Sequence, residues 1–205
     1  MGTSPTILGA SITGNGGSYS GLNAAVPASG TAAYNDMYSS GLAAFGGFSD
    51  TGGPAFWFTG TNLNLWASMF VKQLLAERVY IGLFESTLLT TTLYATDTET
   101  AHNYACFRWS TTVPDAYIQC ITCDGTTQNI QSSGVAMDTK SHSYLIVFND
   151  SAPNVKFYID GTLVATSTSN LPATSTLMCY QVGFAATDYA QPHIGVSGVT
   201  IQSDC

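Results

Sequence analysis

Acidic side chains that could hydrolyse a glycosidic bond are few in this chain. Such hydrolysis needs two carboxyl groups flanking the bond, one acting as the acid and the other as the nucleophile or base. The chain contains three glutamates: Glu77, Glu85 and Glu99. Glu77 and Glu85 flank one predicted strand at opposite ends, so they are poorly placed to act on the same bond. We therefore expect that the protein is not an enzyme.

Thiol and imidazole groups do not complete a metal or redox site either. Cys120 and Cys123 form a C-x-x-C, a spacing that occurs in metal and redox sites. They lie in YIQCITCDGTTQ, which is typical of a strand running into a turn, so residues three apart point to opposite faces. No second C-x-x-C is present, and the three histidines are isolated: His102, His142 and His193. We expect structural thiols, no catalytic triad, no metal and no cofactor.

Carbohydrate binding requires less than catalysis, namely aromatic platforms and a few polar groups. Trp109, Asp115 and Tyr117 lie at one predicted hairpin tip, and Asp188 and Tyr189 lie at another. An aromatic ring exposed at such a tip could stack on a sugar, although Trp and Tyr also complete cores and interfaces. We consider Trp109, Asp115 and Tyr117 possible glycan contacts.

A hairpin over residues 155–166 is the most clearly defined element of the chain. Its centre is Asp160-Gly161, and an Asp-Gly pair readily takes the positive φ angles of a type I′ turn. We predict three pairs across this hairpin: Ile159 with Thr162, Tyr158 with Leu163 and Phe157 with Val164. In this register Val164 faces the core and Ala165 faces outward.

A strand upstream of the hairpin, SYLIVFN, extends it to three strands. A loop of residues 149–154 gives these pairs: Phe148 with Val155, Ile146 with Phe157 and Tyr144 with Ile159. The outer face then carries apolar side chains where a solvated sheet is usually polar. Because an exposed apolar patch marks an interface, we predict a subunit interface at Leu145, Val147, Tyr158 and Leu163. Cover of this face by the chain's own N-terminal segment or by a long loop is the alternative.

The remaining chain divides into two parts by composition. Residues 1–54 are rich in Gly, Ser, Ala and Thr, and we expect an irregular N-terminal arm that includes the first strands. Residues 55–205 carry many short strands with two-residue alternation, which indicates an antiparallel β-sandwich. In the last strand, Ile194 and Val196 are out of step with Val199 and Ile201, so we predict a bulge near Gly198. We expect one domain overall.

Charge and hydrophobicity exclude several classes of partner. Only 9% of the residues are charged and the formal net charge is −8. Phosphate contacts need clustered cations, whereas the five basic residues are scattered: Lys72, Arg78, Arg108, Lys140 and Lys156. No apolar run reaches the 18 or so residues that a membrane span needs. We expect no nucleic acid, no membrane and, because the start lacks a signal-peptide pattern, synthesis in a reducing cytoplasm.

Several segments occur in the order seen in concanavalin A-like lectin and glucanase jelly rolls: YIGLFES, CFRWSTT, CDGTTQNIQSSGVAMDTKSHSYLIVFND, VKFYIDGTLVATSTSNLP and HIGVSGVTIQ. Over residues 56–202 the chain most closely resembles the version of this LamG-like fold found in the virion proteins of tailed bacteriophages. The resemblance implies an all-β antiparallel jelly roll. Calcium in related lectins is held by clustered acidic residues. The aspartates here are isolated in sequence, so calcium is not indicated.

Functions within this superfamily differ, and the fold alone does not select one. We predict a non-enzymatic structural protein of a bacteriophage virion: a capsid decoration, surface or tail-associated component that is homo-oligomeric. It would dock through its N-terminal arm and apolar face onto copies of itself and other virion proteins. It would assemble in the host cytoplasm and then be extracellular. The alternative is a lectin-like carbohydrate-binding module for attachment to glycans or a host surface.

Overall fold

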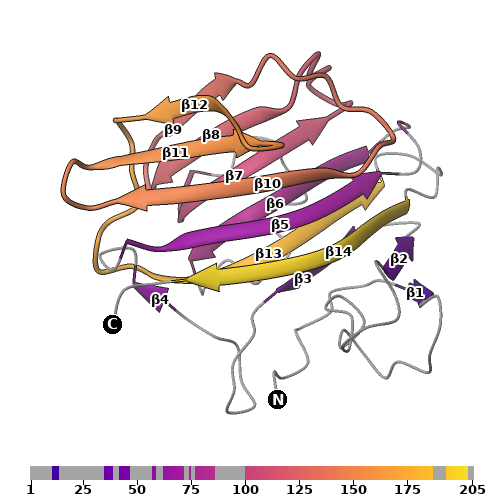
Figure 1. The fold of residues 1–205 in the computed structure, drawn as a ribbon, viewed down its shortest axis with the longest axis horizontal. Helices are drawn as coiled ribbons and strands as arrows, with labels where there is room; N and C mark the ends of the chain where they lie inside the picture. Colours follow the sequence, from indigo (N-terminus) through magenta and orange to yellow (C-terminus); the bar gives the residue numbers. More distant parts are fainter. Residues whose placement is uncertain are drawn as a thin grey trace, which may run out of the picture.

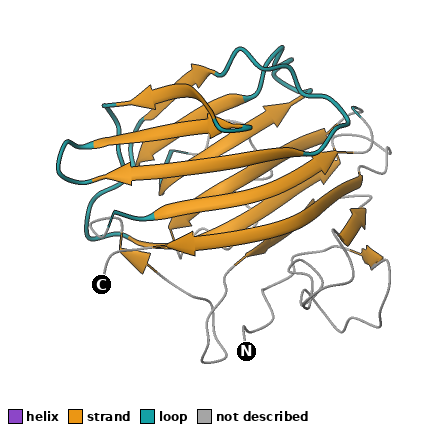
Figure 2. Cartoon of the chain, in the orientation of Figure 1, coloured by secondary structure: helices purple, strands orange, loops and turns teal. Residues whose placement is uncertain are grey.

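The computed structural model describes residues 62–71, 74, 77–85, 100–186 and 193–202, together with four short strands nearer the N-terminus. These are β1 (Ser11–Thr13), β2 (Asn35–Tyr38), β3 (Leu42–Gly46) and β4 (Trp57–Phe58). Every regular element of the described residues is a strand, as Figure 2 shows. Within these residues, no helix has the length and apolarity to cross a membrane.

Two antiparallel sheets face each other in a sandwich (Figure 1). The front sheet has the order β1, β2, β14 (His193–Gln202), β5 (Asn64–Val71), β10 (His142–Asn149), β11 (Asn154–Ile159) and β12 (Thr162–Ser167). The back sheet has the order β3, β13 (Leu177–Ala186), β6 (Glu77–Glu85), β7 (Asn103–Ser110), β8 (Gln119–Asp124) and β9 (Gln128–Ser132), and β4 pairs with β13. The predicted all-β antiparallel sandwich is confirmed.

The core lies between the sheets and follows from two-residue alternation along each strand. In β5, Leu65, Ala67, Met69 and Val71 are buried, whereas the intervening Trp66 is 39% exposed. Phe107 of β7 sits at the centre of the core. Its ring contacts Tyr144 of β10 at 5.0 Å and Phe157 of β11 at 5.2 Å between centroids, both edge to face. Such aromatic pairs add to the free energy gained by burial and lock the two sheets together.

The register of β10 with β11 is the predicted one. Phe148 pairs with Val155, Ile146 with Phe157 and Tyr144 with Ile159. Asp160 and Gly161 have φ angles of 50° and 76°, as a type I′ turn requires. The bulge predicted near Gly198 is also confirmed, because the pairing of β14 with β5 shifts between Val196 and Gly198.

The predicted pairing of Phe157 with Val164 is wrong. A bulge between β11 and β12 pairs Phe157 with Ala165 and leaves Val164 as the extra residue. Ala165 therefore faces the core and is 8% exposed, and Val164 is partly buried against the core. The sequence TLVATS allows this shift because it carries three apolar residues in succession, so either register buries one of them.

Strands from the predicted N-terminal arm pair with the main strands of the same chain. β2 pairs with β14 at the edge of the front sheet, and β3 pairs with β13 in the back sheet. Pairing within the chain agrees with the view that this segment packs on its own domain. The docking of the arm onto a neighbouring subunit stays a prediction.

The outward faces of the two sheets differ. On the back sheet the outward side chains of β6, β7 and β8 are buried, with exposed fractions of 0–1%: Tyr80, Phe84, Tyr104, Cys106, Ile121 and Cys123. The front sheet instead carries the exposed Trp66 and Leu163 on its outward face. The back sheet does expose one large apolar side chain, Ile130 of the edge strand β9, at 45%. Among the central strands, those of the front sheet therefore offer the more accessible surface to a ligand.

Candidate functional site

The two glutamates considered for glycoside hydrolysis lie at opposite ends of β6. Eight residues of extended strand separate Glu77 from Glu85 by about 27 Å. The two carboxyl groups of a glycosidase are about 5–9.5 Å apart. Glu85 also has a structural role, because its Oε2 accepts hydrogen bonds from the backbone N and Nδ2 of Asn103, both at 2.8 Å. Glu99 lies outside the described residues, and the expected lack of enzymatic activity stays a prediction.

The three predicted glycan contacts at the hairpin tip have different surroundings. Trp109 is 7% exposed, belongs to the core and donates Nε1–H to the carbonyl of Asp115 at 3.1 Å. Asp115 binds the buried Arg108, with Nε to Oδ2 and Nη2 to Oδ1 both at 3.2 Å. Tyr117 is 45% exposed. Trp109 therefore completes the core, the alternative that the sequence left open, and of the three residues only Tyr117 presents its ring to solvent. Asp188 and Tyr189 lie outside the described residues.

Charge pairing explains the burial of Arg108. Burial by itself lowers the pKa of a guanidinium, but the hydrogen bonds and negative charge of Asp115 outweigh it, and the net pKa of Arg108 is raised. The side chains of Arg108 and Asp115 are 6% and 7% exposed. Asp115 also accepts from the backbone N of Ser110 at 3.0 Å. These contacts hold the hairpin tip together, which is a structural role.

Cys106, Cys120 and Cys123 are buried and form no disulfide within the described residues. Cys120 points into the core and Cys123 points to the opposite side of the back sheet, as the spacing predicts. Burial raises the pKa of Cys120 to about 12, and burial likewise raises that of Cys106, so neither thiol is a ready nucleophile. Among the described residues, no group of three or more His, Cys, Asp or Glu is placed to hold a metal ion.

Four side chains form a continuous row across the front face, which we call the Trp66 row: Trp66, Leu145, Tyr158 and Leu163. Trp66 of β5 lies opposite Leu145 of β10, which lies opposite Tyr158 of β11, which in turn lies opposite Leu163 of β12. Neighbouring strands are about 4.8 Å apart, so the row is about 14 Å long. Trp66 is 39% and Leu163 49% exposed, and the other two are partly buried.

A second row, the Lys156 row, runs parallel to the first: Asn64, Val147, Lys156 and Thr166. It lies two residues further along β5, β10 and β11, about 7 Å away, and three residues further along β12 because of the bulge. Thr166 is exposed and the other three are partly buried. Oδ1 of Asn64 is shielded from solvent and, within the described residues, accepts no hydrogen bond. Hydrogen-bonding groups thus flank one side of the Trp66 row.

Serines flank the other side of the Trp66 row. Ser68 of β5 lies opposite Ser143 of β10, and Ser68 Oγ is 3.2 Å from Ser141 Oγ. Beyond them, at the same end of the sheet, His142 of β10 lies opposite the buried Met69, on the core side of the strand. Its Nδ1 is 2.6 Å from Asp160 Oδ2 and its Nε2 is 3.0 Å from Asp138 Oδ1. The imidazole therefore ties the start of β10 to the turn between β11 and β12.

Protonation of His142 should stabilise this end of the sheet. Burial lowers the pKa of His142, but its hydrogen bonds to Asp160 and Asp138 and their charges raise it further, so the net pKa is raised. The folded state then binds the proton more tightly than the unfolded state, whose pKa is about 6.5. The resulting stability is fully present below pH 6.5 and is lost as the pH rises through the raised pKa of the folded state.

We predict that the free energy of unfolding falls by up to about 1 kcal/mol between pH 6 and pH 8.5, a small value because both aspartates are partly exposed. Urea unfolding of the wild type and His142→Asn across this range measures it. The variant should lose the slope. A slope that persists unchanged in His142→Asn would contradict the role of this imidazole.

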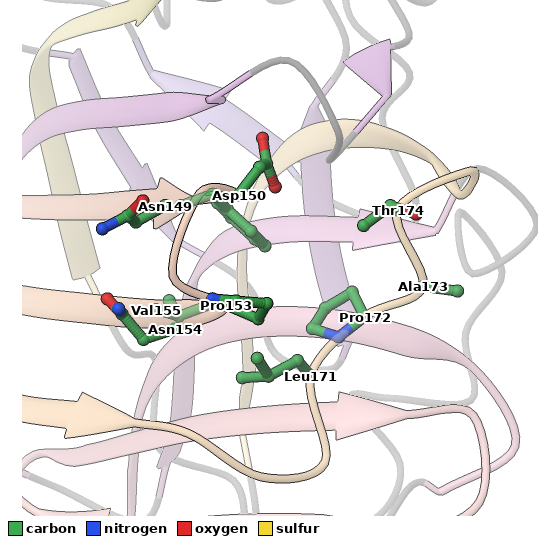
Figure 3. A pocket seen from close by; sticks show the side chains of 10 residues that line it. Asn149, Asp150, Pro153, Asn154, Val155, Leu171, Pro172, Ala173 and Thr174 are labelled. Carbon is green, nitrogen blue, oxygen red and sulfur yellow. The ribbon is translucent and has the colours of Figure 1, made fainter.

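A small cavity lies at the end of the front sheet, beside the loop between β10 and β11. Its volume is about 180 Å³. Figure 3 shows the rings of Pro153 and Pro172 facing each other with Leu171 nearby, and the Asp150 carboxylate turned away from Pro172. Asp150 Oδ2 accepts from the backbone N of Asn62 at 2.6 Å. Because the lining is mostly apolar and lacks convergent polar groups, we do not place the functional site there.

The four residues predicted as a subunit interface do lie together on the outward face. Leu145, Val147 and Tyr158 are partly buried and Leu163 is exposed. Their contact with another subunit stays a prediction. Trp66 was missing from the predicted set because the sequence does not show that β5 lies beside β10.

No protein-family model matches this chain, and no curated protein matches it. Solved structures do match. The carbohydrate-binding module CBM66 from Bacillus subtilis has a TM-score of 0.55 at 12% identity, covering 98% of this chain and 96% of its own. The potassium-bound carbohydrate recognition domain of Emp46p has a TM-score of 0.58 at 8% identity, covering 98% and 89%. The alginate lyase A1-II′ of polysaccharide lyase family 7 has a TM-score of 0.57 at 8% identity, covering 84% and 81%.

The fold is a concanavalin A-like jelly roll. This jelly roll is widespread, since 290 chains of solved structures match it. At 8–12% identity the likeness shows the fold alone. The names of the three structures above refer to carbohydrate or polysaccharide, and none of them refers to a virion. The predicted place in a bacteriophage particle therefore has no support from these structures.

Proposed function

We propose that this jelly roll is a carbohydrate-binding module and that its site is the Trp66 row with the flanking Lys156 row. The observation that carries the proposal is the exposed indole of Trp66 in register with the Tyr158 ring on the open sheet face. Aromatic side chains offer large flat surfaces at low entropic cost and combine an apolar face with a polar edge. The apolar face of a sugar ring can stack on such a surface.

Shape supports a chain-like ligand. The Trp66 row is about 14 Å long and crosses four neighbouring strands. A sugar chain lying along it would place its ring faces on Trp66 and Tyr158 and its hydroxyl edges toward Lys156 and Thr166.

Similar structures agree with this choice. CBM66 and the Emp46p domain are named for binding or recognising carbohydrate. Each match covers nearly the whole of this chain and most of the other chain. Because fold does not determine function, this agreement only adds to the argument from the exposed rings.

A protein contact on the same face is the second candidate. It is favoured by the two aliphatic side chains of the row, Leu145 and Leu163, of which Leu163 is 49% exposed. An exposed apolar patch is typical of protein interfaces. The predicted contacts with copies of this chain and with virion proteins belong to this candidate.

A glycan array probed with the full chain, followed by calorimetry on the hits, tests the proposal. We expect saturable binding to oligosaccharides, with affinity that increases from one to about three sugar units because the row is extended. Sedimentation of the free chain between about 1 and 100 μM tests the second candidate. If the chain binds no glycan and forms a dimer whose interface buries Trp66, this result favours the protein contact and contradicts the proposed function.

A further inference from the structure

Lys156 occupies an unusual position on the open face. It lies on β11, next to the edge strand of the front sheet, opposite Val147 on β10 and Thr166 on β12, and two residues from Tyr158. Its side chain is partly buried. In the part of the chain that the structure describes, this side chain forms no ion pair and no hydrogen bond. The ammonium group is therefore available to a ligand on this face.

Two other cations of the described residues, Arg108 and Lys140, lie near carboxylates. Arg108 binds Asp115 at 3.2 Å, and Lys140 is 3.6 Å from Asp138. The protein has thirteen acidic residues against five basic ones, so a counter-ion for a lysine is readily available within the sequence. In the free protein, a partly buried cation loses part of its hydration, and no protein partner replaces the lost water. In the complex, an anionic group of the ligand replaces it with a charge-assisted hydrogen bond.

We infer that the glycan bound on this face is acidic and that one of its carboxylate groups pairs with Lys156. The inference rests on the proposed function and names its ligand class. The Lys156 row lies about 7 Å to the side of the Trp66 row. A sugar ring that stacks on Tyr158 therefore directs a substituent on its edge toward Lys156. In a uronic acid this substituent is a carboxylate.

The net charge of the chain acts against this pairing over long distances. The formal charge is −8, which repels an anionic polymer. At physiological ionic strength this repulsion is screened beyond about 8 Å, whereas the contact with Lys156 is short. Asp160 follows the C-terminal end of β11 and is four residues from Lys156, about 13 Å along the strand. Its carboxylate is hydrogen-bonded to His142 and to the backbone N of Ser143. Asp150, at the other end, binds Asn62.

Matched ligand pairs separate the charge from the rest of the sugar. We would measure binding of the full chain by calorimetry at 0.15 M salt with hexamers of β-1,4-linked glucuronate and glucose. Polygalacturonate and its methyl ester would form the second pair. We expect the acidic member of at least one pair to bind about fivefold more tightly than its neutral partner. Lys156→Gln should remove this preference and leave binding of the neutral member within about twofold.

Lys140→Gln is the matched control, because Lys140 is an exposed lysine outside both rows that is already near Asp138. It should keep the acidic preference. Equal affinities for both members of each pair, all lost in Trp66→Ala, would overturn the inference and leave the proposed function standing. Absence of binding to all four ligands would overturn the inference, and the glycan array would then decide the proposed function separately.

Discussion

Replacing Trp66 and Tyr158 together with alanine is expected to weaken glycan binding at least a hundredfold while leaving the fold intact. Buried aromatic anchors at the centre of a binding site contribute roughly 2 kcal/mol or more each when truncated, and 1.4 kcal/mol is tenfold in affinity. The fold should tolerate the change because Trp66 is 39% exposed and Tyr158 is partly buried on the outward side. Each truncation should cost less than about 1 kcal/mol of unfolding free energy.

Two further variants identify the type of contact. Trp66→Phe keeps a ring and should retain part of the affinity, whereas Trp66→Leu keeps apolar area without a ring and should lose most of it. A protein contact driven by apolar area would tolerate both replacements more evenly. The comparison therefore separates sugar stacking from subunit association on the same surface.

Tyr117→Ala is the control for this experiment. Tyr117 is an aromatic residue of similar exposure, 45%, at the hairpin tip that also holds Trp109 and Asp115. It lies outside the Trp66 row, so its truncation should leave affinity unchanged. Full affinity in the folded Trp66/Tyr158 double variant, with a loss in Tyr117→Ala, would instead place the site at the hairpin tip.

Local patterns were sufficient to predict the register of β10 with β11. An Asp-Gly turn fixes one end of the hairpin, and bulky residues at alternate positions allow only one alignment that buries them all. The bulge in β14 could be predicted for the same reason, because the alternation of Ile194 and Val196 is out of step with that of Val199 and Ile201 unless one residue is extra. In these segments the hydrophobic pattern has a single solution.

Local patterns fail where the sequence has more than one solution or no apolar signal. In TLVATS, either Val164 or Ala165 can face the core, and the structure places Ala165 there. β9, with the sequence QNIQS, has little apolar alternation and was not predicted as a strand. It pairs with β8, and its side chains reach β12: Asn129 Nδ2 donates to Ser167 Oγ at 2.8 Å.

The candidate site depended on contacts between distant parts of the chain. Leu145 and Tyr158 are close in sequence and were placed on one outward face from alternation alone. Trp66 joins them only because β5 pairs with β10, about eighty residues away, and no local pattern indicates which strands become neighbours. The burial of the outward side chains on the back sheet is likewise a property of the folded chain. Together these two facts make the front face the open one.

Local patterns did not decide whether Trp109 is exposed or buried, because a ring near a hairpin tip can be either. Asp115 folds back along the tip and binds Arg108, which precedes Trp109 on β7. The backbone of Asp115 then accepts the indole N–H of Trp109. An ion pair between residues seven apart is not visible in a strand pattern, although an Arg followed by Asp around a Pro-containing turn could have suggested it.

Asp115→Asn is expected to lower the free energy of unfolding by about 3–5 kcal/mol, the usual cost of leaving one partner of a buried ion pair without its counter-charge. The guanidinium of Arg108 is 6% exposed and its two hydrogen bonds to Asp115 are charge-assisted. Arg108 cannot escape the penalty by losing its proton, because an arginine remains charged at any ordinary pH. Urea unfolding followed by tryptophan fluorescence measures the change.

Asp124→Asn provides the matched control for that replacement. Asp124 is exposed and accepts from the backbone N atoms of Thr126 and Thr127 at 2.9 and 2.8 Å. An asparagine oxygen can accept the same bonds, so the cost should stay below about 1 kcal/mol. Because Asp115 has a structural role, we also expect the folded fraction of Asp115→Asn to bind glycan as tightly as the wild type. Unchanged stability with reduced glycan affinity would instead make Asp115 a ligand contact and move the site away from the Trp66 row.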